Sequence, residues 1–90
     1  MKSFDCPYKS FDELYDTMLR GNEIEFRYKD KLYFILPYYK GMEVIGVSFG
    51  KFNSEEVKVC FSKQELYEIK VDNMPLGEII TSVDILWNNF

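Results

Sequence analysis

Residues 23–36 constrain the fold most strongly, because they combine an alternating strand, a short polar break and a second apolar strand. Residues 23–28 read E-I-E-F-R-Y, which is the alternation of a strand with one buried face. The break at 29–31 predicts a hairpin loop. Residues 32–36, L-Y-F-I-L, are apolar on both faces, which is typical of a strand that is central or covered on both sides. Pro37 is expected to end this strand, and the segment predicts an antiparallel sheet.

The alternation also assigns the faces of the first strand. Three side chains are expected to face the core: Ile24, Phe26 and Tyr28. Three are expected to face water: Glu23, Glu25 and Arg27. The hairpin register stays open. A three-residue loop would align the buried set with Leu32, Phe34 and Leu36, whereas a two-residue loop would swap the faces.

A helix is predicted at the N-terminal side of this hairpin. Ser10 and Glu13 form a capping box, in which each side chain can bond to the backbone amide of the other residue. An apolar stripe then follows at helical spacing: Phe11, Leu14, Tyr15, Met18 and Leu19. Gly21 is placed to end the helix in a left-handed conformation.

The remaining residues predict two more strands, two short helices and a closing strand. The strands are expected at 42–49 and 56–61, after turns at 38–41 and 50–55. In 56–61, one face would carry Val57, Val59 and Phe61, and the other Lys58 and Cys60. A second capping box at 62–65 predicts a helix that runs through Ile69. Pro75 is expected to begin a further short helix, and the alternation of residues 83–88 predicts a strand. The predicted fold is a single α+β domain over residues 1–90, with an N-terminal helix, an antiparallel sheet of four or five strands and two short C-terminal helices on one sheet face.

Composition excludes several partners and locations. The formal charge is −4, from 15 acidic and 11 basic residues, which argues against a nucleic-acid binder and against docking on an anionic membrane. It permits a basic protein partner. No apolar run could span a bilayer, and residues 1–7 lack the apolar region of a signal peptide. Cys6 and Cys60 are expected to be free thiols in a reducing compartment, so a cytoplasmic location is expected.

The chain lacks the residues of common catalytic centres. It contains no histidine, no G-x-G-x-x-G motif and no Walker A loop, so we expect no enzyme activity, no cofactor and no metal site. Glu23 and Glu25 form a carboxylate pair, but alternation places both in water, whereas a catalytic pair of the glycosidase type needs a buried carboxylate beside a cleft. Cys60 is expected to be an inert thiol, buried or half-buried, because only Lys58 is placed to activate it.

Two surfaces are candidates for binding. The first is acidic and comprises Asp12, Glu13, Asp16, Glu23 and Glu25. This surface could dock on a basic groove of a partner. Alternatively, its residues could simply form the solvated faces of a helix and a sheet. The second lies in the predicted turns and comprises Tyr38, Tyr39, Phe49 and Phe52. These aromatic side chains could anchor a protein partner, or they could fold back to cap a small core.

Residues 11–35 carry a resemblance to known sequences. The order F-D-E-L helix, Gly, E-I-E-F strand and K-x-Y strand resembles short uncharacterised proteins of Gram-positive bacteria, their phages and mobile elements, and residues 75–79 resemble their closing segment. The resemblance implies a fold and no functional residues. It favours a non-enzymatic inhibitor-type binder, such as an anti-defence, immunity or antitoxin protein. The alternative is a structural, self-associating domain of a phage or bacterial assembly.

Overall fold

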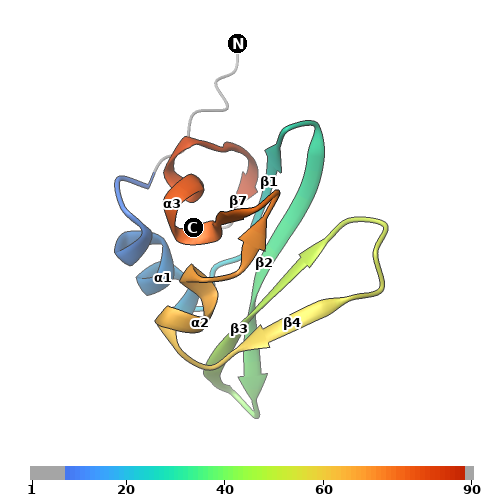
Figure 1. Ribbon diagram of the computed structural model, residues 1–90. Helices are drawn as coiled ribbons and strands as arrows, with labels where there is room; N and C mark the ends of the chain where they lie inside the picture. The colour runs from blue at the N-terminus through green and yellow to red at the C-terminus, as the bar shows by residue number, and fades with distance from the viewer. Residues whose placement is uncertain (1–7, 89–90) are drawn as a thin grey trace.

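The computed structural model describes residues 8–88, so the predicted free thiol Cys6 lies outside the described residues (Figure 1). The elements, in chain order, are α1 (Phe11–Leu19), β1 (Ile24–Tyr28), β2 (Lys31–Lys40), β3 (Glu43–Lys51), β4 (Val57–Cys60), α2 (Lys63–Tyr67), β5 (Lys70–Val71), β6 (Met74–Pro75), α3 (Leu76–Ile79), the 3-10 turn η1 (Ile80–Ser82) and β7 (Asp84–Asn88). Within this part of the chain, no helix is long and apolar enough to cross a membrane.

The main sheet is antiparallel and has five strands in the order β4-β3-β2-β1-β7. The first four strands form a meander, and β7 returns after the C-terminal helices to pair with β1. Figure 1 shows the helices gathered on one side of this sheet. The predicted α+β fold is therefore confirmed, with the closing strand as the fifth member of the sheet.

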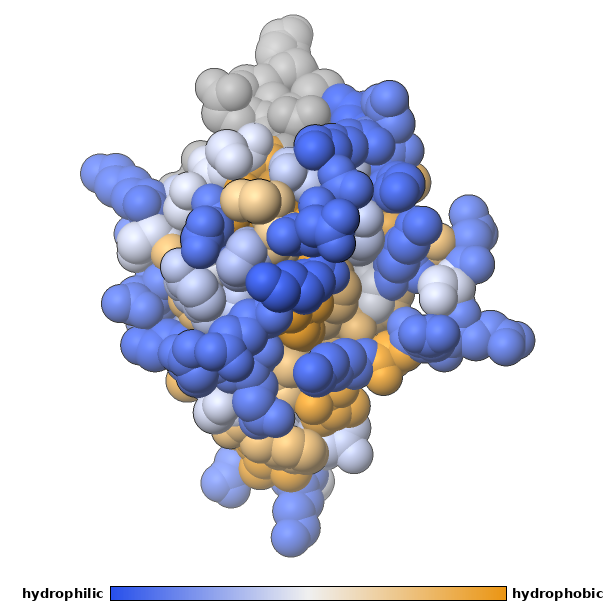
Figure 2. All heavy atoms as spheres, viewed as in Figure 1, coloured by the Kyte–Doolittle hydropathy of each residue, from blue (hydrophilic) through white to orange (hydrophobic). Residues whose placement is uncertain are grey.

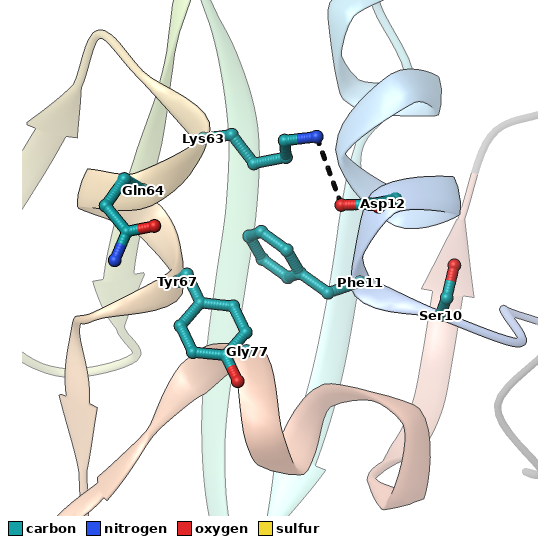
Figure 3. Close-up of a pocket in the computed structure, with 7 residues that line it drawn as sticks. All are labelled: Ser10, Phe11, Asp12, Lys63, Gln64, Tyr67 and Gly77. Carbon is teal, nitrogen blue, oxygen red and sulfur yellow. Dashed lines mark ion pairs between the residues drawn. The ribbon is translucent and has the colours of Figure 1, made fainter.

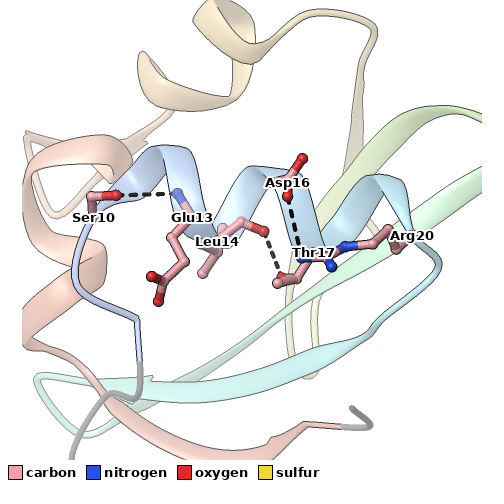
Figure 4. Close-up of polar contacts among 6 residues, drawn as sticks. All are labelled: Ser10, Glu13, Leu14, Asp16, Thr17 and Arg20. Atoms are coloured by element: carbon pink, nitrogen blue, oxygen red, sulfur yellow. Dashed lines mark hydrogen bonds and ion pairs between the residues drawn. The ribbon is translucent and has the colours of Figure 1, made fainter.

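Helix α1 begins and ends where the sequence predicts. The Ser10 hydroxyl accepts a hydrogen bond from the Glu13 amide at 3.1 Å, as a capping residue should (Figure 4). Leu14 and Met18 are fully buried on its apolar face. After the helix, Gly21 has a φ of +92°, a conformation that a residue with a Cβ rarely adopts.

The β1–β2 hairpin has a two-residue loop. Lys29 and Asp30 both have positive φ, at 49° and 64°, which is the conformation of a type I′ turn. As a result Phe26 pairs with Tyr33 and Ile24 pairs with Ile35. Of the two registers left open by the sequence, the structure has the one that turns Tyr33 and Ile35 toward the helices.

Strand β2 does not end at Pro37, and the predicted loop at 38–41 is wrong. The strand continues to Lys40, and the turn to β3 lies at Gly41 and Met42. The pairing of β1 with β2 stops at Ile35, so Pro37 has a paired strand on one side only. A proline can occupy such an edge position, because its missing N–H breaks no ladder bond when it faces the unpaired side.

The predicted grouping of side chains in β4 is confirmed. Cys60 pairs with Val47, and both side chains are fully buried on the helix-facing side of the sheet, in line with the expectation for Cys60. Val57 is 51% exposed and Phe61 58% exposed, so the apolar set on the other face points away from the main core. Alternation predicts the two sets, but nothing within a four-residue strand indicates which of its two faces meets the helices.

The C-terminal region contains a hairpin that the sequence analysis missed. Helix α2 opens with the predicted capping box but ends at Tyr67, two residues earlier than expected. A two-stranded hairpin, β5–β6, follows, with Asp72 and Asn73 in left-handed conformations. The helix predicted after Pro75 is confirmed in α3 and continues as η1. The helices bury their apolar side chains against Ile24, Phe26, Ile35, Val47 and Cys60 in one core.

Candidate functional site

The sheet face opposite the helices is apolar and partly exposed, and we call it the open face. The strand register places alternate side chains of β2 and β4 on it. Its apolar members are Leu32, Phe34, Leu36, Tyr38, Phe52, Val57, Val59 and Phe61. Five of these are exposed: Leu32, Tyr38, Phe52, Val57 and Phe61. Apolar side chains gathered on one surface in this way are typical of interaction sites.

Strand β3 carries only small residues on this face. Its positions on the open face are Gly46, Ser48 and Gly50, which pair with Tyr38, Leu36 and Phe34 on β2. A Cβ added to Gly50 would lie 2.3 Å from the Phe34 ring, so Phe34 lies directly over that glycine. A Cβ added to Gly46 would lie 3.1 Å from the ring of Phe61 and 2.6 Å from the Cys60 carbonyl oxygen. Glycine is therefore required at both positions for the aromatic rings to lie across the strand.

Two edge-to-face aromatic pairs fix the side chains of the open face. Phe34 and Phe52 have ring centroids 5.7 Å apart, and Tyr38 and Phe61 have centroids 5.9 Å apart. This geometry is favourable for aromatic rings and restricts their rotamers before any partner arrives. In the view of Figure 2, hydrophobic residues gather in the lower half, toward the part of the sheet where β2, β3 and β4 meet, and hydrophilic residues cover most of the rest.

The open face also carries charge at its β1 margin. Glu25 pairs with Phe34 and Arg27 pairs with Leu32, so these two side chains lie on the same face as the aromatic pairs. Glu25 is half-buried and Arg27 is exposed. An apolar centre beside charged side chains is the usual anatomy of a protein interface.

The predicted acidic surface is divided by the sheet. Asp12 pairs with Lys63 at 3.1 Å and Asp16 pairs with Arg20 at 3.2 Å, both on the helix side of the molecule. Figure 4 shows the second of these pairs along α1. A carboxylate oxygen of Glu13 accepts from the Lys9 amide at 3.2 Å.

The sheet-side acids lie apart from this helix set. Glu23 is half-buried just before β1, and Glu25 is on the open face. The structure therefore brings only Glu25 together with the predicted aromatic residues.

The predicted aromatic patch is divided too. Tyr38 and Phe52 lie on the open face. Phe49 lies in β3, not in a turn, and stacks on the helix-facing side with Tyr33 at 5.7 Å. Tyr39 follows a register shift in β2, and its hydroxyl lies 3.0 Å from where a Cβ of Gly21 would be.

Sequence reasoning missed six of the eight apolar residues of the open face. The missed residues are Leu32, Phe34, Leu36, Val57, Val59 and Phe61. The signal that could have found the β2 members was the apolar character of residues 32–36 on both faces, because helices gathered on one side of a sheet cover only one of them.

A pocket of about 440 Å³ lies between the start of α1, helix α2 and Gly77 (Figure 3). Figure 3 shows the Lys63–Asp12 ion pair spanning it above the rings of Phe11 and Tyr67. Those rings meet edge-to-face at 5.2 Å. The Ser10 hydroxyl in this pocket accepts the helix-capping bond, and the Asp12 carboxylate in the lining is paired with Lys63.

The described residues offer little reactive chemistry. The Cys60 side chain is fully buried, and burial raises the pKa of its thiol, so the nucleophilic thiolate is disfavoured. Residues 8–88 contain no group of three or more Cys, Asp or Glu side chains that could hold a metal ion. No protein-family model matches the sequence, and neither a curated protein nor a solved structure matches the chain. Function must therefore be inferred from the surfaces themselves.

Proposed function

We propose that this chain is a non-enzymatic protein-binding domain that docks through its open face. The observation that carries the proposal is the two-sided apolar character of β2. Ile35 is buried under the helices, whereas Leu32, Phe34 and Leu36 on the other side have no helix over them among residues 8–88. A partner that covers the open face would complete the second layer that such a strand normally has.

The energetics favour a partner with an apolar contact surface. Fully burying a Phe or Val side chain contributes roughly 1.5–3 kcal/mol. Phe61 and Val57 retain more than half of their exposure, and Tyr38 retains 40%, so much of this contribution is unused in the free chain. The surrounding protein is acidic, with a charge of −4, so a partner with basic residues around its apolar centre would associate fastest.

We favour a cytoplasmic inhibitor, immunity or antitoxin protein, with an anti-defence role in a phage or mobile element as one form of it. Three features support this choice. The chain is short and acidic, it resembles short proteins of phages and mobile elements over residues 11–35, and its rigid aromatic face suits the blocking of another protein's surface. Such a protein works by occupying a site and needs no reactive group of its own.

The test is to find the partner and then to disrupt the open face. The tagged chain would capture binding proteins from a lysate of the source organism, and each candidate would be purified and titrated by calorimetry. We expect Phe61→Lys and Val57→Lys each to weaken binding at least tenfold, because hot-spot truncations cost about 2 kcal/mol or more. Met42→Lys is the matched control, since Met42 is fully exposed in the β2–β3 turn. Equal affinity of all three variants and the original chain would refute the proposal.

Self-association is the second candidate function, and the aromatic rings packed over β3 favour it. The rings of Phe34 and Phe61 lie over Gly50 and Gly46, and together they give this face an apolar surface on which a second sheet could pack in an aligned sandwich. Sedimentation velocity over a wide concentration range separates the two functions. A dimer that Phe61→Lys dissociates and Met42→Lys does not would favour self-association. A monomer at all concentrations would exclude it.

A further inference from the structure

A second cavity, which we call the lysine pocket, lies on the helix-facing side of the sheet, away from the open face. Its volume is about 470 Å³, which is within the usual range of small-molecule sites. Tyr33 and Phe49 line it from the sheet, and residues 69–72 line it from the β5 segment. The lysine pocket therefore sits at the end of the sheet that the helices leave uncovered.

Four lysines from four different strands line this pocket: Lys31, Lys51, Lys58 and Lys70. The register explains part of this arrangement, because Lys51 pairs with Tyr33 and Lys58 pairs with Phe49, which places these two lysines and Lys31 on the helix-facing side of the main sheet. Lys70 lines the pocket from β5, in the separate two-stranded sheet. These lysines are distant in sequence, so only the fold brings them together.

The charge of the lysine pocket opposes that of the chain. Against the four lysines it has two carboxylates, Glu56 and Asp72, so the charged lining sums to +2 in a chain of net charge −4. Asp72 is also neutralised locally, since its carboxylate lies 2.8 Å from the Lys29 ammonium. This contact lowers the pKa of Asp72 and raises the pKa of Lys29. The excess of lysines in the lining favours a bound anion, whose charge would offset theirs.

Aromatic rings give the pocket an apolar wall. Phe26, Tyr33 and Phe49 form a stack, with centroids 5.3 Å and 5.7 Å apart and interplanar angles of 21° and 19°. Phe26 and Tyr33 are buried, whereas Phe49 is half-buried and lines the pocket. Lysines act as point charges for phosphate, and an aromatic surface stacks on a planar base.

We propose that the lysine pocket binds a free nucleoside di- or triphosphate, with the phosphates among the lysines and the base against the aromatic wall at Phe49. A free nucleotide fits better than a nucleic-acid strand, because the chain as a whole is acidic and a strand needs a long basic path. The inference goes beyond protein binding through the open face, and either can fail without the other.

The test is calorimetric titration of the full-length chain with ATP at low and physiological salt. We expect Lys51→Gln and Lys58→Gln each to weaken ATP binding about tenfold, which corresponds to the loss of one charge-assisted contact. Lys40→Gln is the matched control, because Lys40 is an exposed lysine at the far end of β2 that does not line the pocket. Asp72→Asn should strengthen binding, since it removes a carboxylate from the lining.

Other probes separate a nucleotide from other phosphates. Inorganic triphosphate should bind more weakly than ATP, and ATP should shift the ring proton resonances of Phe49 in NMR spectra. Equal affinity for inorganic triphosphate would overturn the assignment of the base site, and tighter binding of a short oligonucleotide would assign the pocket to nucleic acid instead. No ATP binding, or the same loss in Lys40→Gln as in the pocket variants, would overturn the proposal entirely. Circular dichroism of each variant checks that it is folded.

Discussion

Gly77 in α3 gives the sharpest test of the packing described above. A Cβ at this position would lie 1.8 Å from Cδ2 and 2.3 Å from Cγ of Tyr67. Cγ lies on the axis about which the ring rotates, so turning the ring cannot relieve the overlap. Tyr67 is also held from its other side, where it meets Phe11 edge-to-face at 5.2 Å. Gly77→Ala must therefore displace α3 or the whole Tyr67 side chain.

Two opposing effects set the size of the change. Overpacking usually costs about 1–3 kcal/mol. Alanine favours a helix over glycine by about 1 kcal/mol, and this gain should be available because Gly77 is not among the residues with positive φ. We therefore expect Gly77→Ala to lower the free energy of unfolding by up to about 2 kcal/mol, which at about 4–8 °C per kcal/mol is measured as a fall in Tm.

A double-mutant cycle identifies the cause. Urea unfolding would be measured for the original chain, Gly77→Ala, Tyr67→Ala and the double variant. In the Tyr67→Ala background the obstructing ring is gone, so the same Gly77→Ala change should be neutral or stabilising by up to about 1 kcal/mol. If Gly77→Ala stabilises the original chain, or destabilises both backgrounds equally, the contact between Gly77 and Tyr67 does not have the role assigned to it.

Three further predictions concern the thiol and the turns. In a Cys6→Ser variant, Cys60 should react with a chromogenic disulfide reagent only as fast as the chain unfolds, and fast labelling of the native state would contradict its burial. Asp30→Gly should increase the free energy of unfolding by about 0.5 kcal/mol, because Asp30 has a φ of 64° and glycine adopts positive φ without the steric cost of a Cβ. The urea midpoint should therefore rise, and a lower midpoint would contradict the turn geometry. The lowered pKa of Asp72 means that its contact with Lys29 stabilises the fold above the ordinary carboxyl pKa and is lost as pH falls through the lowered value. Asp72→Asn should therefore reduce Tm slightly at neutral pH and leave it unchanged in strong acid; an equal reduction at both would point to a cause other than charge.

Local chemistry made much of the fold predictable. The serine half of both predicted capping boxes forms, because a hydroxyl three residues before an amide needs no tertiary partner to find it. The two glutamates accept from the amides one residue before the caps, Lys9 and Phe61. The predicted alternation of residues 23–28 is also confirmed, because Ile24 and Phe26 are fully buried. These signals reside within a few residues of one another, so a single sequence contains them completely.

The errors arose where a distant strand decides the outcome. Pro37 stays inside β2 because β1 stops pairing at Ile35, which the residues around Pro37 do not encode. Strand β4 could have turned either face to the helices, and the pairing of Cys60 with Val47 of another strand decides between them. The lysine pocket was invisible for the same reason, since its lysines come from four strands that only the fold brings together.

The turn at Lys29 and Asp30 links the fold to both proposed sites. Strand β2 is apolar on both faces, so the hydrophobic pattern alone could turn either face toward the helices. A loop one residue longer would place Tyr33 on the outside and Phe34 in the core. The two-residue loop instead stacks Tyr33 with Phe49 at the lysine pocket and leaves Phe34 paired with Phe52 on the open face. The left-handed conformations of two polar residues therefore determine which aromatic side chains are available to a nucleotide and which to a protein partner.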